Sequence, residues 1–214
     1  MNHCNKLISF QQSNIRSREF DKIIFVVTRS CQLSCSYCYV KREDAHMTYD
    51  VLYRSLWVIS QMKKKKPVTI IFFGGEPLLK FNLIKLAILT LNKIDKKNIH
   101  NYDFSLFTNG VLLNHIDLVF LKKFKVRLDI SLDGERKTHN INRGSKNIDS
   151  YGAIIKAMPK IKSLGINTTV FSTLTVDTAR NLYRNYLYFK NLGFNSIETC
   201  PVLYTADIKH KLWD

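Results

Sequence analysis

Acidic residues, proline and long apolar runs are all scarce in this 214-residue sequence. No apolar run approaches the ~18 residues that a bilayer-spanning helix needs, and residues 1–10 lack the charged and apolar regions of a secretory signal. We therefore expect a cytoplasmic protein with no membrane partner. Because 33 basic residues outnumber 17 acidic ones, the formal net charge is +16, which favours polyanionic partners. No recognised nucleic-acid-binding motif accompanies that charge.

The cysteines are few and unevenly placed. There are five, an odd number, which argues against a disulfide framework in a chain without a secretion signal. Cys31, Cys35 and Cys38 form a C-x3-C-x2-C loop, whereas Cys4 and Cys200 are isolated. Structural zinc sites generally need a second cysteine pair, which is absent, so an unusual zinc loop is the lesser alternative. Three thiolates on one loop suit a [4Fe–4S] cluster whose fourth iron stays open.

Short β-branched and aromatic runs alternate along the chain with longer segments of helical period. The predicted strands are residues 22–28, 68–73, 102–107, 126–132, 166–174 and 196–203. The predicted helices are residues 48–62, 81–96, 115–123, 150–164 and 178–192. Gly165 and Gly193 follow two of these helices, where a left-handed cap favours glycine.

This alternation predicts an α/β fold made of βαβ units, with a mostly parallel sheet and outer helices. Periodicity leaves open whether the sheet curls into a barrel or opens into a doubly wound sheet. In both, the loops at the carboxyl ends of the strands form the functional edge. At this length we expect one core domain over residues 21–214, preceded by an N-terminal arm over residues 1–20.

Further motifs stand at the ends of successive predicted strands. The second strand runs into Gly74-Gly75-Glu76-Pro77, and the third is followed by Thr108-Asn109-Gly110. The fourth ends in Ser131-Leu132-Asp133-Gly134, with His139 and Arg143 shortly after it. Each motif alone is compatible with an ordinary turn, but the cysteine loop and all three motifs follow one another at successive strand ends.

In this order the motifs resemble the radical SAM superfamily. Within it, the sequence is most similar to the peptide- and protein-modifying branch that usually carries a C-terminal SPASM region, such as anaerobic sulfatase maturases. The resemblance covers roughly residues 21–203 and implies a partial (β/α)6 barrel. It also implies a [4Fe–4S] cluster and S-adenosylmethionine, which the reduced cluster cleaves to a 5′-deoxyadenosyl radical that removes a hydrogen atom from substrate. A low-potential electron donor such as flavodoxin or ferredoxin is expected.

The resemblance assigns roles residue by residue. Cluster ligands are Cys31, Cys35 and Cys38; cofactor contacts are Tyr37 beside the adenine, Gly74, Gly75 and Glu76 at the methionyl group, Asn109, Ser131 at the ribose and Arg143 at the carboxylate. We expect glycine at positions 74 and 75 because the backbone approaches the ligand there.

Plainer interpretations compete at several of these positions. Tyr37 is alternatively a packing residue under the loop, and Asn109 a turn former. For His139 a surface or structural role is favoured over a proton shuttle, and for Cys200 a buried, inert thiol is favoured over one that faces the substrate. Cys4 has no predicted role.

The cysteine-rich C-terminal region of SPASM-type relatives is missing here, and with it any transferable catalytic base. We therefore expect a single cluster, in a truncated, split or minimal enzyme, with a partner subunit as one way to complete it. A peptide or protein substrate is favoured. The alternatives are a glycyl-radical activase or an RNA- or nucleoside-modifying radical enzyme, and a non-catalytic, cluster-binding remnant.

Overall fold

A computed structural model describes residues 20–62, 66–145 and 147–202. Its strands are β1 (Lys22–Thr28), β2 (Val68–Gly74), β3 (Tyr102–Thr108), β4 (Arg127–Ser131), β5 (Thr168–Leu174) and β6 (Ser196–Pro201). Its α-helices are α2 (Tyr49–Gln61), α3 (Phe81–Ile94), α4 (Leu118–Lys123), α5 (Arg136–Arg143), α6 (Ser150–Ser163), α7 (Val176–Arg180) and α8 (Leu182–Leu192). Short 3-10 helices are η1 (Pro77–Lys80), η2 (Lys96–Asn101) and η3 (Leu113–His115).

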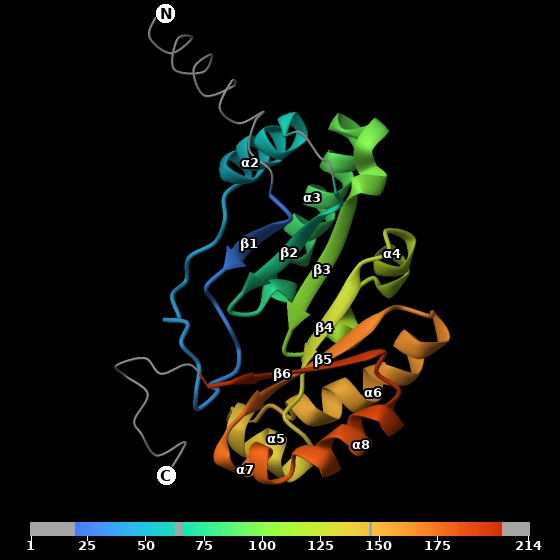
Figure 1. The fold of residues 1–214 in the computed structure, drawn as a ribbon. Helices are drawn as coiled ribbons and strands as arrows, with labels where there is room; N and C mark the ends of the chain where they lie inside the picture. The colour runs from blue at the N-terminus through green and yellow to red at the C-terminus, as the bar shows by residue number, and fades with distance from the viewer. Residues whose placement is uncertain (1–19, 63–65, 146, 203–214) are drawn as a thin grey trace, which may run out of the picture.

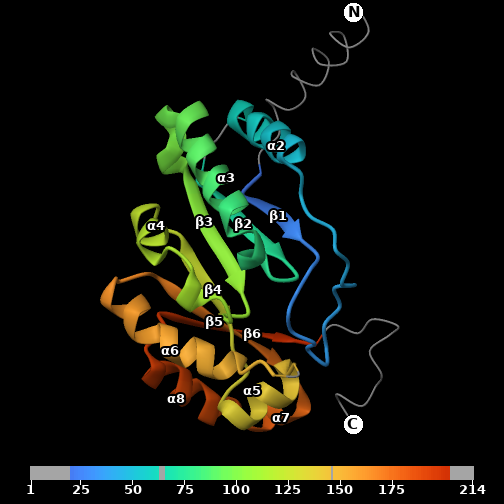
Figure 2. The same cartoon turned by 180° about the vertical axis from the view of Figure 1, so that it is seen from behind.

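The six strands form one sheet in the order β1-β2-β3-β4-β5-β6, and each neighbouring pair is parallel. A doubly wound sheet reverses its strand order at a switch point, whereas sequential order places every crossover on one side and curls the sheet. Figures 1 and 2 show this curved sheet with the helices along its outer face. The fold is therefore the predicted partial barrel, with β1 and β6 as its outermost strands.

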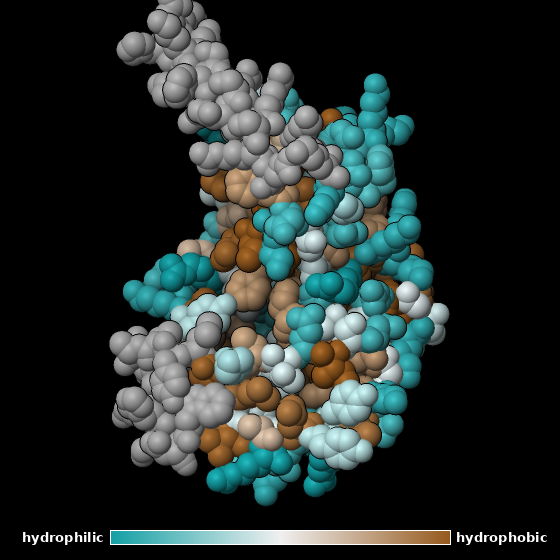
Figure 3. Space-filling model, viewed as in Figure 1, coloured by the Kyte–Doolittle hydropathy of each residue, from teal (hydrophilic) through white to brown (hydrophobic). Residues whose placement is uncertain are grey.

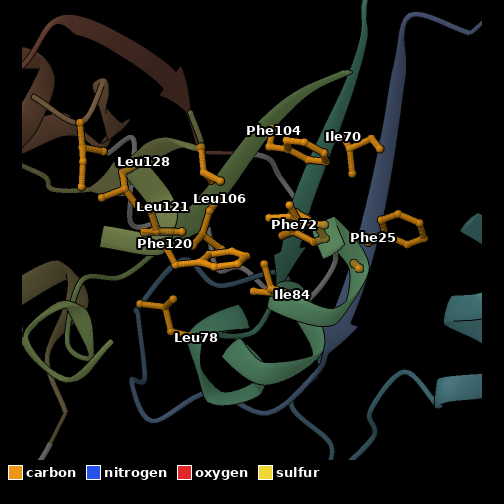
Figure 4. Close-up of a cluster of buried hydrophobic side chains, with 14 of the residues drawn as sticks. Phe25, Ile70, Phe72, Leu78, Ile84, Phe104, Leu106, Phe120, Leu121 and Leu128 are labelled. Atoms are coloured by element: carbon orange, nitrogen blue, oxygen red, sulfur yellow. The ribbon is translucent and has the colours of Figure 1, made fainter. Parts of the chain in front are cut away.

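The main core lies between the sheet and the outer helices. Phe72 of β2 is fully buried and stacks between Phe25 of β1 and Phe104 of β3, with ring centroids 6.1 and 6.4 Å apart. Buried helix residues such as Ile84 complete this cluster (Figure 4). Burial of each large apolar side chain contributes about 1.5–3 kcal/mol, so the sheet is fixed from its outer side.

Most predicted elements are confirmed within a few residues. Gly165 and Gly193 have φ of 60° and 82°, as left-handed caps require. The prediction of a single helix over residues 178–192 is wrong, because Asn181 separates α7 from α8. The side-chain amide of Asn181 donates to the Asp177 carbonyl at 2.9 Å.

Helix α5 was not predicted at all. Its eight residues contain a single apolar side chain, Ile141, which is exposed, so no apolar period marks the helix. The residues it buries are polar: His139, Asn142 and Arg143. The predicted arm over residues 1–20 lies almost wholly outside the described residues, and the division into arm and core stays a prediction. No helix among the described residues is long and apolar enough to cross a membrane.

Candidate active site

A cavity of about 330 Å³ opens at the carboxyl ends of the strands. Its wall combines the cysteine loop with residues from the ends of β2 to β6. The predicted site residues on this wall are Cys31, Cys35, Tyr37, Cys38, Gly74, Gly75, Asn109, Ser131 and Arg143. Figure 3 shows the inner side of the sheet, where hydrophobic residues surround a central hollow. The cavity and the predicted site residues therefore lie at the edge where a parallel sheet usually carries its functional site.

Helix α5, which lies far from the cysteine loop in the sequence, contacts that loop and holds it in place. The amide of Ser36 donates to the carbonyl of Asn142 at 2.9 Å, across 106 positions of sequence. On the other side of the loop, the Arg42 guanidinium donates to the Leu33 carbonyl at 3.0 Å and to the Ser34 hydroxyl at 2.8 Å. Leu33 is buried and anchors the middle of the loop. The loop is thus held at Leu33, Ser34 and Ser36.

The three loop thiols differ in exposure. Cys31 and Cys35 are half-buried and Cys38 is exposed. Burial raises the pKa of Cys31, and it raises that of Cys35 to about 11 although the charge of Arg143 acts in the opposite direction. Among the described residues, no three His, Cys, Asp or Glu side chains enclose a single metal ion. A four-iron cluster makes a different demand, because each thiolate binds a different iron.

Gly74 and Gly75 join the end of β2 to the start of the cysteine loop. The amide of Gly75 donates to the Thr28 carbonyl at 2.8 Å, and a Cβ at Gly75 would lie 2.3 Å from the Ser30 carbonyl oxygen. At Gly74, with φ of 153°, a Cβ would lie 2.1 Å from the Thr28 oxygen. The close approach that demands glycine here is to the chain's own backbone, and the expected approach to a ligand stays a prediction.

Glu76 lies behind the cavity wall, fully buried. Its carboxylate accepts from the Thr108 hydroxyl at 2.8 Å, from the backbone amide of Asn109 at 2.7 Å and from the backbone amide of Leu78 at 3.0 Å. Burial raises the pKa of Glu76 to about 7, although these three donors favour the ionised form. Glu76 thus clamps the third-strand loop to the second, and its predicted contact with the cofactor stays a prediction.

Asn109 forms a turn, which is the plainer of its two predicted roles, and it also contacts the cysteine loop. Its side-chain oxygen accepts from the Val111 amide at 3.0 Å, which makes a turn, while its side-chain nitrogen lies 3.6 Å from the sulfur of Cys31 as a donor. The predicted contact of Asn109 with the cofactor stays a prediction.

Arg143 and Tyr37 pack together on the cavity wall. The guanidinium carbon lies 5.3 Å from the centre of the Tyr37 ring, and Nη2 donates to the Thr173 hydroxyl at 3.2 Å. Nε lies 3.1 Å from Oδ2 of Asp133 as an ion pair, but without an aligned hydrogen bond, so this buried donor has no acceptor among the described residues. Burial lowers the pKa of Arg143, but Asp133, Tyr37 and Cys35 together raise it above its usual value.

His139 and Cys200 have different outcomes. His139 is fully buried. Its Nδ1 accepts from the backbone amide of Asp133 at 3.3 Å, and its Nε2 lies 2.9 Å from the Ser150 hydroxyl. Burial lowers its pKa to about 4, and these surroundings support the structural role. Cys200, expected to be buried, is exposed at the edge strand and lines the cavity, which corrects that prediction. Cys4 lies outside the described residues.

Sequence reasoning missed two features of the site. Asp133 was only part of a turn motif, yet it is fully buried and binds both Arg143 and Tyr37. The second feature is an aromatic wall of Phe73, Phe107 and Phe171, with centroids 5.6 and 4.5 Å apart. The alternation of strand residues marks these positions as inward-facing once the register is known.

Comparison of the sequence with models of known protein families identifies the family of this chain. The family model of the radical SAM superfamily matches residues 25–183. The chain belongs to the radical SAM superfamily. Membership in this superfamily implies a [4Fe–4S] cluster and S-adenosylmethionine.

Relatives in this superfamily include protein maturases. The cysteine-type anaerobic sulfatase-maturating enzyme of Clostridium perfringens is 26% identical over 187 residues, which is 82% of this chain and 50% of that enzyme. The structure of native anSMEcpe with bound AdoMet and Cp18Cys peptide matches 90% of this chain and 54% of its own, with TM-score 0.78 and 25% identity. Streptococcus suis SuiB bound to S-adenosylmethionine shares the fold, with TM-score 0.70 and 15% identity over 97% of this chain and 45% of its own. The chain spans about half the length of these relatives.

The residues present fit the implied groups. Three thiols and Arg143 line one cavity, and Nε of Arg143 pairs with Asp133 at 3.1 Å. Thiols match the iron of a cluster, and an arginine beside the same cavity matches a carboxylate.

Proposed function

We propose that this radical SAM enzyme holds one [4Fe–4S] cluster on Cys31, Cys35 and Cys38 and acts on a peptide or protein. When bound, the cluster supplies the electron that converts S-adenosylmethionine to methionine and the 5′-deoxyadenosyl radical, which takes a hydrogen atom from the substrate. The observation that carries the proposal is the meeting of the three thiols, Ser131 and Arg143 on one cavity. These groups come from segments about a hundred positions apart in the sequence.

The chain's own residues have separate tasks in this scheme. Arg143 offers the cofactor carboxylate a fixed positive charge, because its own position is set by Tyr37 and Thr173. Ser131 offers a hydroxyl from the end of β4 to the ribose. Phe73, Phe107 and Phe171 form an apolar wall, which excludes water and stray hydrogen donors from a reactive radical.

A peptide substrate is supported by the relatives. The structure of anSMEcpe was solved with a peptide, and its chain shares the cavity-bearing region with this one. Glycyl-radical activases and RNA-modifying enzymes usually lack the segment from Ser131 to Arg143, which here reaches the cavity. We place the reaction in the cytoplasm, because Cys31, Cys35, Cys38 and Cys200 are all free thiols. A low-potential reductant and a partner subunit that completes the open sheet edges belong to the same proposal.

Deuterium transfer tests the substrate class. The anaerobically reconstituted enzyme is incubated with dithionite, S-adenosylmethionine and a library of perdeuterated peptides or, separately, perdeuterated RNA. We expect deuterium in 5′-deoxyadenosine only with peptides. Transfer from RNA alone would replace the peptide proposal with the nucleic-acid alternative, and absence of 5′-deoxyadenosine in every reaction would favour the remnant.

A further inference from the structure

We propose that Asp133 is the positioning residue of the cofactor site: its buried carboxylate fixes Arg143 and Tyr37 on the cavity wall without itself facing the cofactor. This inference rests on the proposed function, because it assigns Arg143 to S-adenosylmethionine. Asp133 follows β4 and is fully buried, and it is not among the residues that line the cavity. It therefore acts through its neighbours.

Asp133 joins three separate elements. Oδ2 accepts the hydroxyl of Tyr37 from the cysteine loop and pairs with Nε of Arg143 from α5 at 3.1 Å. Oδ1 accepts the backbone amide of Thr173 in β5 at 3.0 Å. All three of these partners line the cavity, so one carboxylate sets the spacing between the cluster loop, α5 and the end of β5.

The charge of this carboxylate matters as well as its shape. Arg143 is only 8% exposed, and an unpaired charge at such a position is costly to bury. Without its counter-ion, the guanidinium is expected to turn toward water or to draw water into the cavity. Both changes weaken a directed contact with a ligand carboxylate, since such a contact depends on orientation.

Asp133→Asn tests this role, because it keeps the side-chain shape and removes the charge. The anaerobically reconstituted variant and wild type are compared for iron content, thermal unfolding and the Kd of S-adenosylmethionine by equilibrium dialysis. We expect iron content to be retained while Kd rises on the order of 10- to 100-fold, the loss expected for a charge-assisted contact.

The chain contains a matched control in Asp129. It is also fully buried, lies within β4, the strand that precedes Asp133, and forms a bidentate pair with Arg127 at 2.7 and 3.0 Å. Neither Asp129 nor Arg127 lines the cavity. Asp129→Asn is therefore expected to lower the unfolding temperature at least as much as Asp133→Asn, while leaving Kd unchanged.

A double-substitution cycle separates positioning from general destabilisation. If Asp133 acts through Arg143, then Asp133→Asn adds little to the Kd of Arg143→Gln, whereas independent effects would multiply. Should Asp133→Asn fail to fold, Tyr37→Phe removes only the hydroxyl that Asp133 holds and is expected to raise Kd several-fold.

The outcomes distinguish this inference from the proposed function. Wild type that holds a cluster but does not bind S-adenosylmethionine would contradict the proposed function itself. Wild-type binding with an unchanged Kd in Asp133→Asn, or in Tyr37→Phe where the first variant does not fold, would overturn the positioning role alone. An equal loss of affinity in Asp129→Asn, or multiplicative effects with Arg143→Gln, would likewise overturn it.

Discussion

The carboxyl ends of the six strands form one edge of the sheet, and their amino ends form the opposite edge. These two edges are built from different interactions. At the carboxyl edge, loops from distant parts of the chain bind one another through buried polar groups, as in the contacts of Glu76 with Asn109 and of Asp133 with Thr173. At the amino edge the helices end, and basic residues occupy their last turns: Lys93, Lys122, Lys123, Lys160, Lys162 and Lys190. Such cations complement the helix dipole.

The difference separates residues that shape the site from residues that support the fold. Buried polar contacts between loops fix geometry but add little net stability, and their placement at one edge marks that edge as functional. The lysines of the opposite edge account for part of the +16 charge without a polyanionic partner. Changes at the two edges should therefore differ in their effect on cofactor binding.

The largest effect is expected at the cysteine loop. Replacement of Cys31, Cys35 and Cys38 by Ala removes all the thiolates assigned to the cluster, so iron and sulfide should fall from about four each per chain to background. Iron and sulfide analysis after anaerobic reconstitution measures this. Cys200→Ala is the control, since it lines the same cavity from another element, and it should keep the cluster. A full cluster without the three loop cysteines would refute the ligand assignment.

Glycine substitutions at the two edges come next. Gly75→Ala places a methyl group 2.3 Å from the Ser30 carbonyl oxygen, so we expect about 3 kcal/mol of destabilisation from overpacking and loss of S-adenosylmethionine binding. Gly165→Ala at the opposite edge strains a left-handed cap with φ of 60° and should cost about 1 kcal/mol without changing that binding. Urea unfolding and equilibrium dialysis test the pair; equal loss of binding in both would break the comparison.

Glu76 predicts a pH dependence. Because burial raises its folded pKa to about 7 from an ordinary value of 4.5, the folded state holds the proton more tightly. The associated stability is present below pH 4.5 and is lost as pH rises through 7, by on the order of 3 kcal/mol. Urea unfolding across this range should show wild type losing stability relative to Glu76→Gln. A constant difference between the two would show that Glu76 does not titrate in this window.

The smallest effect is expected for Lys122→Ala. Its ammonium donates to the Gly165 carbonyl at 2.8 Å on the exposed amino edge. An exposed contact of this kind is worth less than about 1 kcal/mol, so the unfolding free energy should fall slightly and S-adenosylmethionine affinity should not change. A measurable loss of affinity would mean that the amino edge influences the site.

Much of the fold could be predicted from the sequence, because apolar periods mark both the strands and most of the helices. The order of the motifs also located the cysteine loop and Arg143 at one edge. Helix α5 was missed because it buries polar residues, which leave no apolar period. The role of Asp133 and the exposure of Cys200 depend on which loops meet in space, and that information is not local to any motif.

Formation of 5′-deoxyadenosine tests the central claim most directly. The chain is reconstituted anaerobically with iron and sulfide, reduced with dithionite and supplied with S-adenosylmethionine, and the products are identified by mass. We predict 5′-deoxyadenosine and methionine from wild type and neither from the triple cysteine variant. An intact cluster that never cleaves S-adenosylmethionine would contradict the claim that this cavity supports radical chemistry.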